Sequence, residues 1–231
     1  MSAVVLHGFA GSAKALLPFF PGAAAPELPG HGAAPDATSW EAALRDLGAS
    51  LSRPKVLFGY SMGARLALAL ALRHPDRVER LVLESGTAGI EDARERARRR
   101  ADDDALAGFI EREGMEKFVE RWEEHPTLAS LKPFAARLRP ERLAHRPRGL
   151  ASALRQLGTG AQPSYWEELR GLEVPVLLLA GAQDEKFAAL ARRMRELLPR
   201  AALRLVPDCG HAPHLERPAA FAEALATPEE A

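Results

Sequence analysis

A serine with a glycine two positions away on each side is the strongest chemical signal in the sequence. The segment Gly59-Tyr60-Ser61-Met62-Gly63 follows an apolar run, Val56-Leu57-Phe58, and opens an apolar stretch from Met62 to Arg73. On a sharp turn between a strand and a helix, a serine hydroxyl is lifted into the open, and glycines keep that turn free of collisions. The pattern predicts that Ser61 is a reactive hydroxyl on such a turn.

A serine hydroxyl needs a base beside it, and a histidine is the usual one. His211 lies in the loop Cys209-Gly210-His211-Ala212-Pro213, directly after the apolar run 203–206. Loops that follow parallel strands meet at one edge of a sheet, so this loop can reach Ser61. His214 is the nearby alternative. Three further histidines are flanked by proline or arginine and are predicted to be solvated helix ends: His74, His125 and His145.

A carboxylate that ends another strand would complete the set. Asp184 follows the apolar run 174–180 and would orient His211 and stabilise its imidazolium form. Glu185 and Asp208 are alternatives, and Asp184 could instead only cap the helix from Phe187 onward. The order Ser61, Asp184, His211 along the chain is one that this kind of serine turn is known to use.

A stretch near the N-terminus could stabilise a negative charge beside the serine. His7-Gly8-Phe9 closes the first apolar run, and Gly8 allows a close backbone approach. We expect the backbone N–H groups of Phe9 and Met62 to form an oxyanion hole. A plain glycine turn is the alternative.

The elements that position these residues alternate between strand and helix. Expected strands cover 4–6, 56–58, 81–83, 174–180 and 203–206, with a brief one near 24–27; expected helices cover 40–51, 62–73, 187–198 and 218–226. This alternation predicts an α/β fold, a mostly parallel sheet with helices on both faces. Residues 1–87 and 170–231 would form its core.

Between residues 88 and 169 strand signals vanish. Met115, Phe118, Val119 and Trp122 form an apolar stripe at helical spacing, and an earlier helix carries Leu106, Phe109 and Ile110. Prolines at 126, 133, 140 and 147 are expected to divide the segment into short helices. We interpret it as a helical cap inserted over the carboxyl edge of the sheet, where open α/β sheets bind ligands.

Composition excludes several other classes of protein. Lys+Arg and Asp+Glu are 31 each among 231 residues, so no excess positive charge supports binding to nucleic acid or an anionic membrane. The single cysteine, Cys209, excludes an internal disulfide and Cys-rich zinc sites. No apolar run is long enough for a spanning helix, and no basic segment precedes the first apolar run. A cytoplasmic protein without membrane insertion is expected; the oligomeric state is not indicated.

The chain resembles the α/β-hydrolase superfamily over nearly its full length. Within it, the chain is most similar to the 2-succinyl-6-hydroxy-2,4-cyclohexadiene-1-carboxylate synthase family of menaquinone biosynthesis. The residues that carry this closer resemblance are Leu6 to Phe9, Leu28 to Gly32, Gly59 to Ala67, Arg99 with Asp103, Leu106-Ala107, Phe118 to Trp122, Ala129 to Leu131, Gly158 to Pro163, Asp184 to Phe187 and Gly210-His211.

This resemblance implies a lyase that eliminates pyruvate from an enolpyruvyl cyclohexene substrate, with no metal and no organic cofactor. Ser61, His211 and Asp184 would remove a ring proton without forming an acyl-enzyme. The small-molecule substrate carries several carboxylates, which guanidinium groups bind in a bidentate fork. Arg65 lies one helical turn after Ser61 and can face the pocket. The resemblance assigns substrate binding also to Arg99, Arg142, Tyr60 and Trp122.

Two other functions use the same residues. A carboxylesterase or thioesterase would form an acyl-enzyme on Ser61, since one fold and one constellation serve many reactions. A neutral, apolar ester would not require an arginine-lined pocket. A non-catalytic binding protein on the same fold is the third interpretation, and the complete Ser61, Asp184 and His211 set argues against it.

Overall fold

A five-stranded parallel sheet forms the centre of the molecule. The computed structural model describes residues 3–51 and 56–226. The strands lie side by side in chain order: β1 (Ala3–Leu6), β2 (Val56–Tyr60), β3 (Leu81–Glu84), β4 (Val176–Gly181) and β5 (Ala201–Val206). All four pairings are parallel. The loops that follow the strands therefore emerge at one edge.

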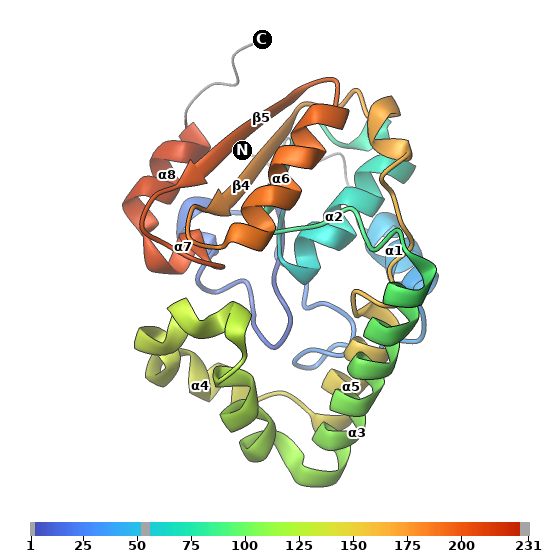
Figure 1. The fold of residues 1–231 in the computed structure, drawn as a ribbon, viewed down its shortest axis with the longest axis vertical. Helices are drawn as coiled ribbons and strands as arrows, with labels where there is room; N and C mark the ends of the chain where they lie inside the picture. Colours follow the sequence, from blue (N-terminus) through green and yellow to red (C-terminus); the bar gives the residue numbers. More distant parts are fainter. Residues whose placement is uncertain (1–2, 52–55, 227–231) are drawn as a thin grey trace.

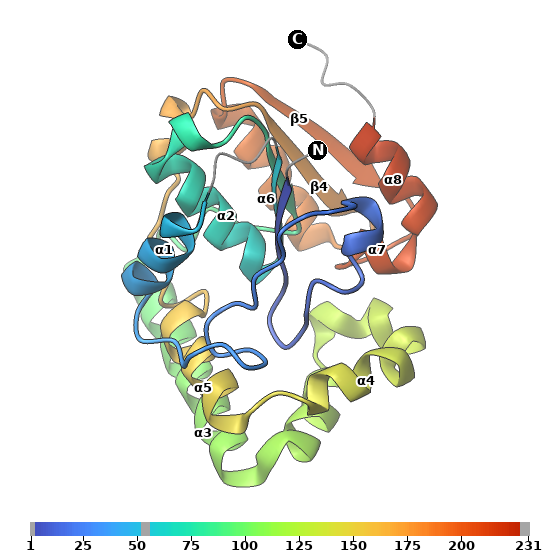
Figure 2. The ribbon, with the colours of Figure 1, turned by 180° about the vertical axis from the view of Figure 1, so that it is seen from behind.

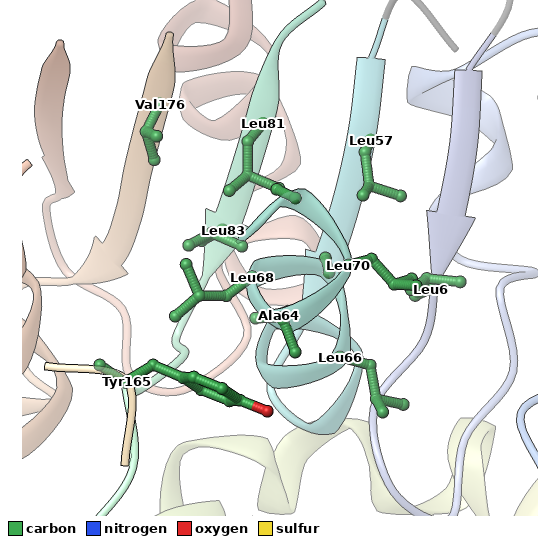
Figure 3. Close-up of a cluster of buried hydrophobic side chains, with 14 of the residues drawn as sticks. Leu6, Leu57, Ala64, Leu66, Leu68, Leu70, Leu81, Leu83, Tyr165 and Val176 are labelled. Atoms are coloured by element: carbon green, nitrogen blue, oxygen red, sulfur yellow. The ribbon is translucent and has the colours of Figure 1, made fainter. Parts of the chain in front are cut away.

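Helices cover both faces of the sheet. The strands are apolar on both faces, as is typical of parallel sheets that are buried on two sides. Val176, Leu178 and Ala180 of β4 pack with α1 (Trp40–Ala49), α2 (Met62–Arg73) and α6 (Glu185–Leu197). Figure 3 shows this cluster, with side chains of α2 against the strands. Leu177 and Leu179 face the other way, towards Phe221 of α8 (Pro218–Ala226). The predicted fold class, a parallel sheet between helices, is confirmed.

Short elements complete this part of the chain: η1 (Leu17–Phe19), η2 (Pro75–Arg77), η4 (Glu168–Gly171) and α7 (Pro213–Glu216). The brief strand predicted near residues 24–27 is reduced to one bridge between Val4 and Ala24. Prolines at 21, 26 and 29 flank that position, and proline cannot donate to a strand ladder.

The described chain between β3 and β4 contains helices and no strand. Besides η4, these are α3 (Ala93–Glu123), η3 (Pro126–Phe134), α4 (Ala135–Leu143) and α5 (Pro147–Leu157), and we call these four the cap. In Figure 1 they lie beyond the carboxyl ends of the strands, coloured green to yellow. The division into a core and a separate cap unit stays a prediction.

The boundaries inside the cap differ partly from those predicted. The two expected apolar helices are both present within α3, and they meet at a kink at Gly114, whose backbone is not helical (φ +79°, ψ −179°). Pro126 and Pro147 begin helices as expected, because the first turn does not need the missing N–H. Pro133 and Pro140 instead lie inside η3 and α4, so the prediction that they end helices was wrong.

The long loop after β1 ties the cap to the sheet. The backbone N–H of Ala37 donates to Ser152 of α5 at 2.8 Å, and that of Gly32 donates to Nδ1 of His145 at 3.0 Å. Figure 2 shows this loop, in blue, extending towards α5. His145 is buried between these segments, so the prediction of a solvated helix end was wrong. None of the helices in the described ranges is both long and apolar enough to cross a membrane.

Candidate active site

Ser61 occupies the turn between β2 and α2 in a backbone conformation that residues other than glycine rarely adopt. Its φ is +51° and its ψ is −106°. A Cβ on Gly59 would lie 2.3 Å from the carbonyl oxygen of Gly63, and a Cβ on Gly63 would lie 2.1 Å from that of Leu6. The predicted steric need for both glycines is confirmed. The turn exists because the chain can pass this close to itself only without side chains.

The structure brings Ser61, His211 and Asp184 together from three loops at the carboxyl edge. Nε2 of His211 lies 3.1 Å from Oγ of Ser61, and Nδ1 lies 2.7 Å from Oδ2 of Asp184. Asp184 also accepts the backbone N–H of Phe187 at 3.3 Å, so it caps α6 while it holds the histidine. The two predicted roles of Asp184 thus do not exclude each other.

The predicted alternatives, Glu185, Asp208 and His214, are not part of this hydrogen-bonded relay. Glu185 is exposed in the first turn of α6. Asp208 is exposed and forms an ion pair with Arg217 at 3.0 Å. His214 pairs with Glu84 rather than with Asp184. None of the three is hydrogen-bonded to Ser61 in the described part of the chain.

Glu216 holds the His211 loop, and the sequence interpretation missed it. Its carboxylate accepts the backbone N–H groups of Gly210 at 2.7 Å and Ala212 at 2.9 Å, one on each side of His211. Ser130 of η3 donates a third hydrogen bond to it. The signal in the sequence was a carboxylate five residues after the candidate histidine, close enough to fold back onto its own loop.

Phe9 and Met62 are the two residues predicted to form the oxyanion hole. Both border the same cavity as Ser61 and His211. Gly8 permits this arrangement, because a Cβ there would lie 2.7 Å from the ring of Tyr60. Their role as donors to an oxyanion stays a prediction.

A cavity of about 1150 Å³ lies between the carboxyl edge of the sheet and the cap. Every residue predicted to contact substrate lines it: Tyr60, Arg65, Arg99, Trp122 and Arg142. The ring of Trp122 meets that of Phe9 edge-on at 5.3 Å. Tyr60 and Arg142, which are 82 positions apart in the sequence, thus line the same cavity as Ser61.

Arg65 is buried on the first turns of α2 and forms no ion pair with any acidic residue that the structure describes. It is 6% exposed, and its guanidinium donates to the carbonyl oxygen of Leu157 at 2.8 Å and to Oε1 of Gln162 at 3.5 Å. Both acceptors are uncharged. Burial, together with the positive charge of Arg99, lowers the pKa of Arg65 to about 9, so the group stays cationic at neutral pH. No described acidic side chain forms an ion pair with this cation, although the charge of Asp103 opposes the lowering of its pKa; a buried cation of this kind favours an anionic ligand.

Arg99 and Arg142 are already paired with carboxylates of α3. Nε of Arg99 lies 2.9 Å from Asp103, and Nη1 of Arg142 lies 3.3 Å from Glu123. Burial lowers the pKa of Arg142, and Glu123 opposes this effect. These two arginines are therefore held in place on the cap side of the cavity.

Asp103 and Gln162 explain the Gly158-Thr159-Gly160 region that the sequence singled out without assigning a role. Oδ2 of Asp103 accepts the backbone N–H of Gly160 at 3.2 Å. Gln162 is fully buried and donates to the carbonyl oxygen of Thr87 at 3.0 Å while its Oε1 faces Arg65. Within residues 3–51 and 56–226, no group of three or more His, Cys, Asp or Glu is arranged to hold a metal ion.

A parallel sheet with a serine on a sharp strand–helix turn, followed along the chain by the aspartate and histidine of the relay, is typical of a known class of enzyme. A model of the alpha/beta hydrolase family matches residues 3–224, and the chain belongs to that family. The fold and the named relatives identify the chain as an enzyme.

Particular members of the family are similar to the chain. It is 44% identical over 169 residues to the putative 2-succinyl-6-hydroxy-2,4-cyclohexadiene-1-carboxylate synthase of Bacillus subtilis, covering 71% of this chain but only 62% of that protein. It is 34% identical over 207 residues to the synthase of the same name from Serratia proteamaculans, covering 86% and 79%. The solved structure of MenH from S. aureus superposes with a TM-score of 0.91 at 32% identity, covering 97% and 91%.

Proposed function

We propose that the protein is a carbon–oxygen lyase of menaquinone biosynthesis. It would eliminate pyruvate from 2-succinyl-5-enolpyruvyl-6-hydroxy-3-cyclohexene-1-carboxylate to give 2-succinyl-6-hydroxy-2,4-cyclohexadiene-1-carboxylate. The observation that carries the proposal is a Ser61–His211–Asp184 relay that opens onto a cavity containing Arg65, a buried arginine that has no ion-pair partner in the described part of the chain. The names of the relatives support the same reaction.

The relay supplies the base for this reaction. Asp184 accepts Nδ1–H of His211, which leaves Nε2 as an acceptor facing the Ser61 hydroxyl. Ser61 then takes the proton from the substrate ring and passes its own to His211. The negative charge that develops on the substrate is stabilised by the backbone N–H groups of Phe9 and Met62. No covalent bond to Ser61 forms.

Arginines fix the substrate against this base. Arg65 binds one carboxylate directly, because its hydrogen-bond acceptors among the described residues are uncharged. Arg99 and Arg142 bind the others from the cap side, and Tyr60 and Trp122 cover the ring. The partner is thus a small polycarboxylate, and the cap, as a unit over the core, closes its pocket.

Pyruvate release tests the proposal. The purified protein is incubated with the enolpyruvyl substrate, and pyruvate is followed by a coupled assay. We expect release far above the spontaneous rate, and its loss in Ser61→Ala. Release at only the spontaneous rate would contradict the lyase function. Rapid turnover of p-nitrophenyl esters without pyruvate release would instead establish the carboxylesterase or thioesterase alternative, in which Ser61 is acylated.

A further inference from the structure

A second histidine–carboxylate pair borders the cavity, three residues after His211. Nδ1 of His214 lies 2.8 and 2.9 Å from the two carboxylate oxygens of Glu84, and the backbone N–H of His214 donates to the same group at 3.1 Å. Glu84 is the last residue of β3 and has no exposed surface. The pair repeats the arrangement of Asp184 and His211, with the carboxylate on Nδ1 in both.

The two carboxylates differ in what else stabilises their charge. Asp184 is 11% exposed and caps α6, whose N-terminal dipole favours a negative charge. Glu84 is fully buried, and among the described residues its carboxylate accepts hydrogen bonds only from His214. A buried carboxylate is costly without a counter-charge, and the His214 ring is the group in contact with it. Glu84 is therefore placed to stabilise a positive charge on that ring.

The Nε2 atom of His214 lies on the side of the ring away from Glu84. Nε2 of His214 makes no hydrogen bond with any described residue, yet it is not one of the fully buried atoms that lack a partner. The side chain lines the same cavity as Ser61. The Tyr60 ring lies between the two imidazoles, 5.6 Å from His211 and 4.7 Å from His214. The imidazoles of both pairs thus border the same cavity.

We propose that His214 is a catalytic residue that donates a proton to the departing pyruvate enolate, with Glu84 keeping that proton on the imidazole. This inference rests on the lyase function proposed above. The proposal makes His211 the base and His214 the acid. Other enzymes also use two similar titratable groups in opposite roles, because their environments favour different protonation states. A signal in the sequence marks the site: Glu84 is a charged residue directly after the apolar run 81–83.

The proton and electron balance of the step is complete. The ring C–H bond breaks, its proton passes through Ser61 to His211, and its electron pair forms the new ring double bond. The C–O bond to the enolpyruvyl group breaks, and that electron pair leaves on the enolate oxygen. The enolate then takes the Nε2 proton of His214 on its methylene carbon, which gives pyruvate. Exchange with water returns the proton of His211 to solvent and restores that of His214.

Glu84→Gln provides the central test, because it keeps an acceptor for His214 but removes the charge that holds the proton. We expect kcat for pyruvate release to fall by roughly 100-fold or more, the range of general acid catalysis. Labelling of Ser61 by a fluorophosphonate uses only the Ser61–His211–Asp184 relay, and fluoride needs no proton donor. Its rate should stay within about threefold of wild type, general catalysis by His211 being intact. A normal labelling rate with normal pyruvate release would overturn the proposal.

Two further measurements test the proposal even if Glu84→Gln does not fold. The double variant His214→Gln, Glu84→Gln has no charged group at these two positions. It should show the same loss of pyruvate release as Glu84→Gln alone. In the wild-type protein, ¹⁵N NMR at pH 7 should show both ring nitrogens of His214 protonated, and a neutral His214 would overturn the proposal without any variant. His74→Gln, at the end of α2 remote from Ser61, is the control and should leave both rates unchanged. If wild type itself released no pyruvate, the proposed function would fail instead.

Discussion

Ser130 of the cap and Glu216 behind His211 share a hydrogen bond of 3.1 Å across 86 residues of sequence. A Cβ on Gly210 would lie 2.3 Å from the Ser130 hydroxyl, so the cap packs directly against the loop that carries the base. Glu216 also accepts the backbone N–H groups on both sides of His211. The position of the imidazole therefore depends on a carboxylate that the cap itself contacts.

Replacing Glu216 should damage the fold and the site together. Glu216→Ala leaves two backbone N–H groups without an acceptor, which costs about 3 kcal/mol of unfolding free energy at about 1–3 kcal/mol each. Ser130→Ala removes one donor and leaves the loop held, so we expect a loss near 1 kcal/mol. Urea denaturation measures both. Asp208→Asn is the control: it removes an exposed carboxylate in the same loop, and Asn tolerates the φ of +53° there, so stability should change by less than about 1 kcal/mol.

Gly63 should tolerate no side chain. Its Cβ would lie 2.1 Å from the Leu6 carbonyl oxygen, and backbone atoms on β1 cannot move away without disturbing the sheet. Gly63→Ala is expected to lose about 3 kcal/mol or more in thermal or chemical unfolding. Gly108→Ala is the matched control, because a Cβ there meets nothing within 4 Å and lies in α3. That variant should gain up to about 1 kcal/mol from helix propensity. Equal stabilities of the two variants would contradict the steric argument.

The serine turn could be predicted from sequence because its determinants are local. Gly59, Ser61 and Gly63 lie within five residues, and their spacing alone specifies the strand–turn–helix geometry. Asp184 and His211 could be placed because each follows a strand of a parallel sheet, so topology fixes the edge at which they meet.

Contacts between distant segments could not be predicted in the same way. Glu84 with His214, Arg65 with Gln162 and Ser130 with Glu216 are separated by 130, 97 and 86 residues. Each depends on how the cap and the C-terminal loops pack, which no periodicity in the sequence encodes. His145 was misjudged for the same reason, since its burial comes from the loop after β1 and not from its neighbours in the chain.

Arg65 should contribute to substrate binding. Arg65→Ala is expected to reduce kcat/KM by about 30- to 1000-fold, which corresponds to about 2–4 kcal/mol for a truncated partner of a buried charge pair. Steady-state kinetics of pyruvate release measures it. Arg73→Ala, on the same helix but in an exposed pair with Glu41, is the control and should leave the kinetics unchanged. Unchanged kinetics in Arg65→Ala would remove this arginine from the site.

The loop that carries Phe9 should make the protein sensitive to acid. His7, His31 and His145 lie in ring contact, with centroids 4.9 Å apart for the first pair and 5.3 Å for the second. Nε2 of His7 accepts the backbone N–H of Leu28, so the ring is neutral in the folded protein. Burial is the largest cause that lowers the pKa of each: to about 4 for His7, well below 6.5 for His31, and downward for His145.

A histidine with a lowered folded pKa binds its proton more readily in the unfolded chain. The stability that neutral His7 contributes is therefore complete above about pH 6.5 and is lost as the pH falls from 6.5 towards about 4. For His7 alone this amounts to about 3 kcal/mol over the window. Urea unfolding between pH 7.5 and 4.5 should show the decline, and His7→Gln should show a shallower one, because Gln does not titrate. His74→Gln should keep the wild-type slope. Parallel curves for wild type and His7→Gln would refute the assignment of the acid sensitivity to His7.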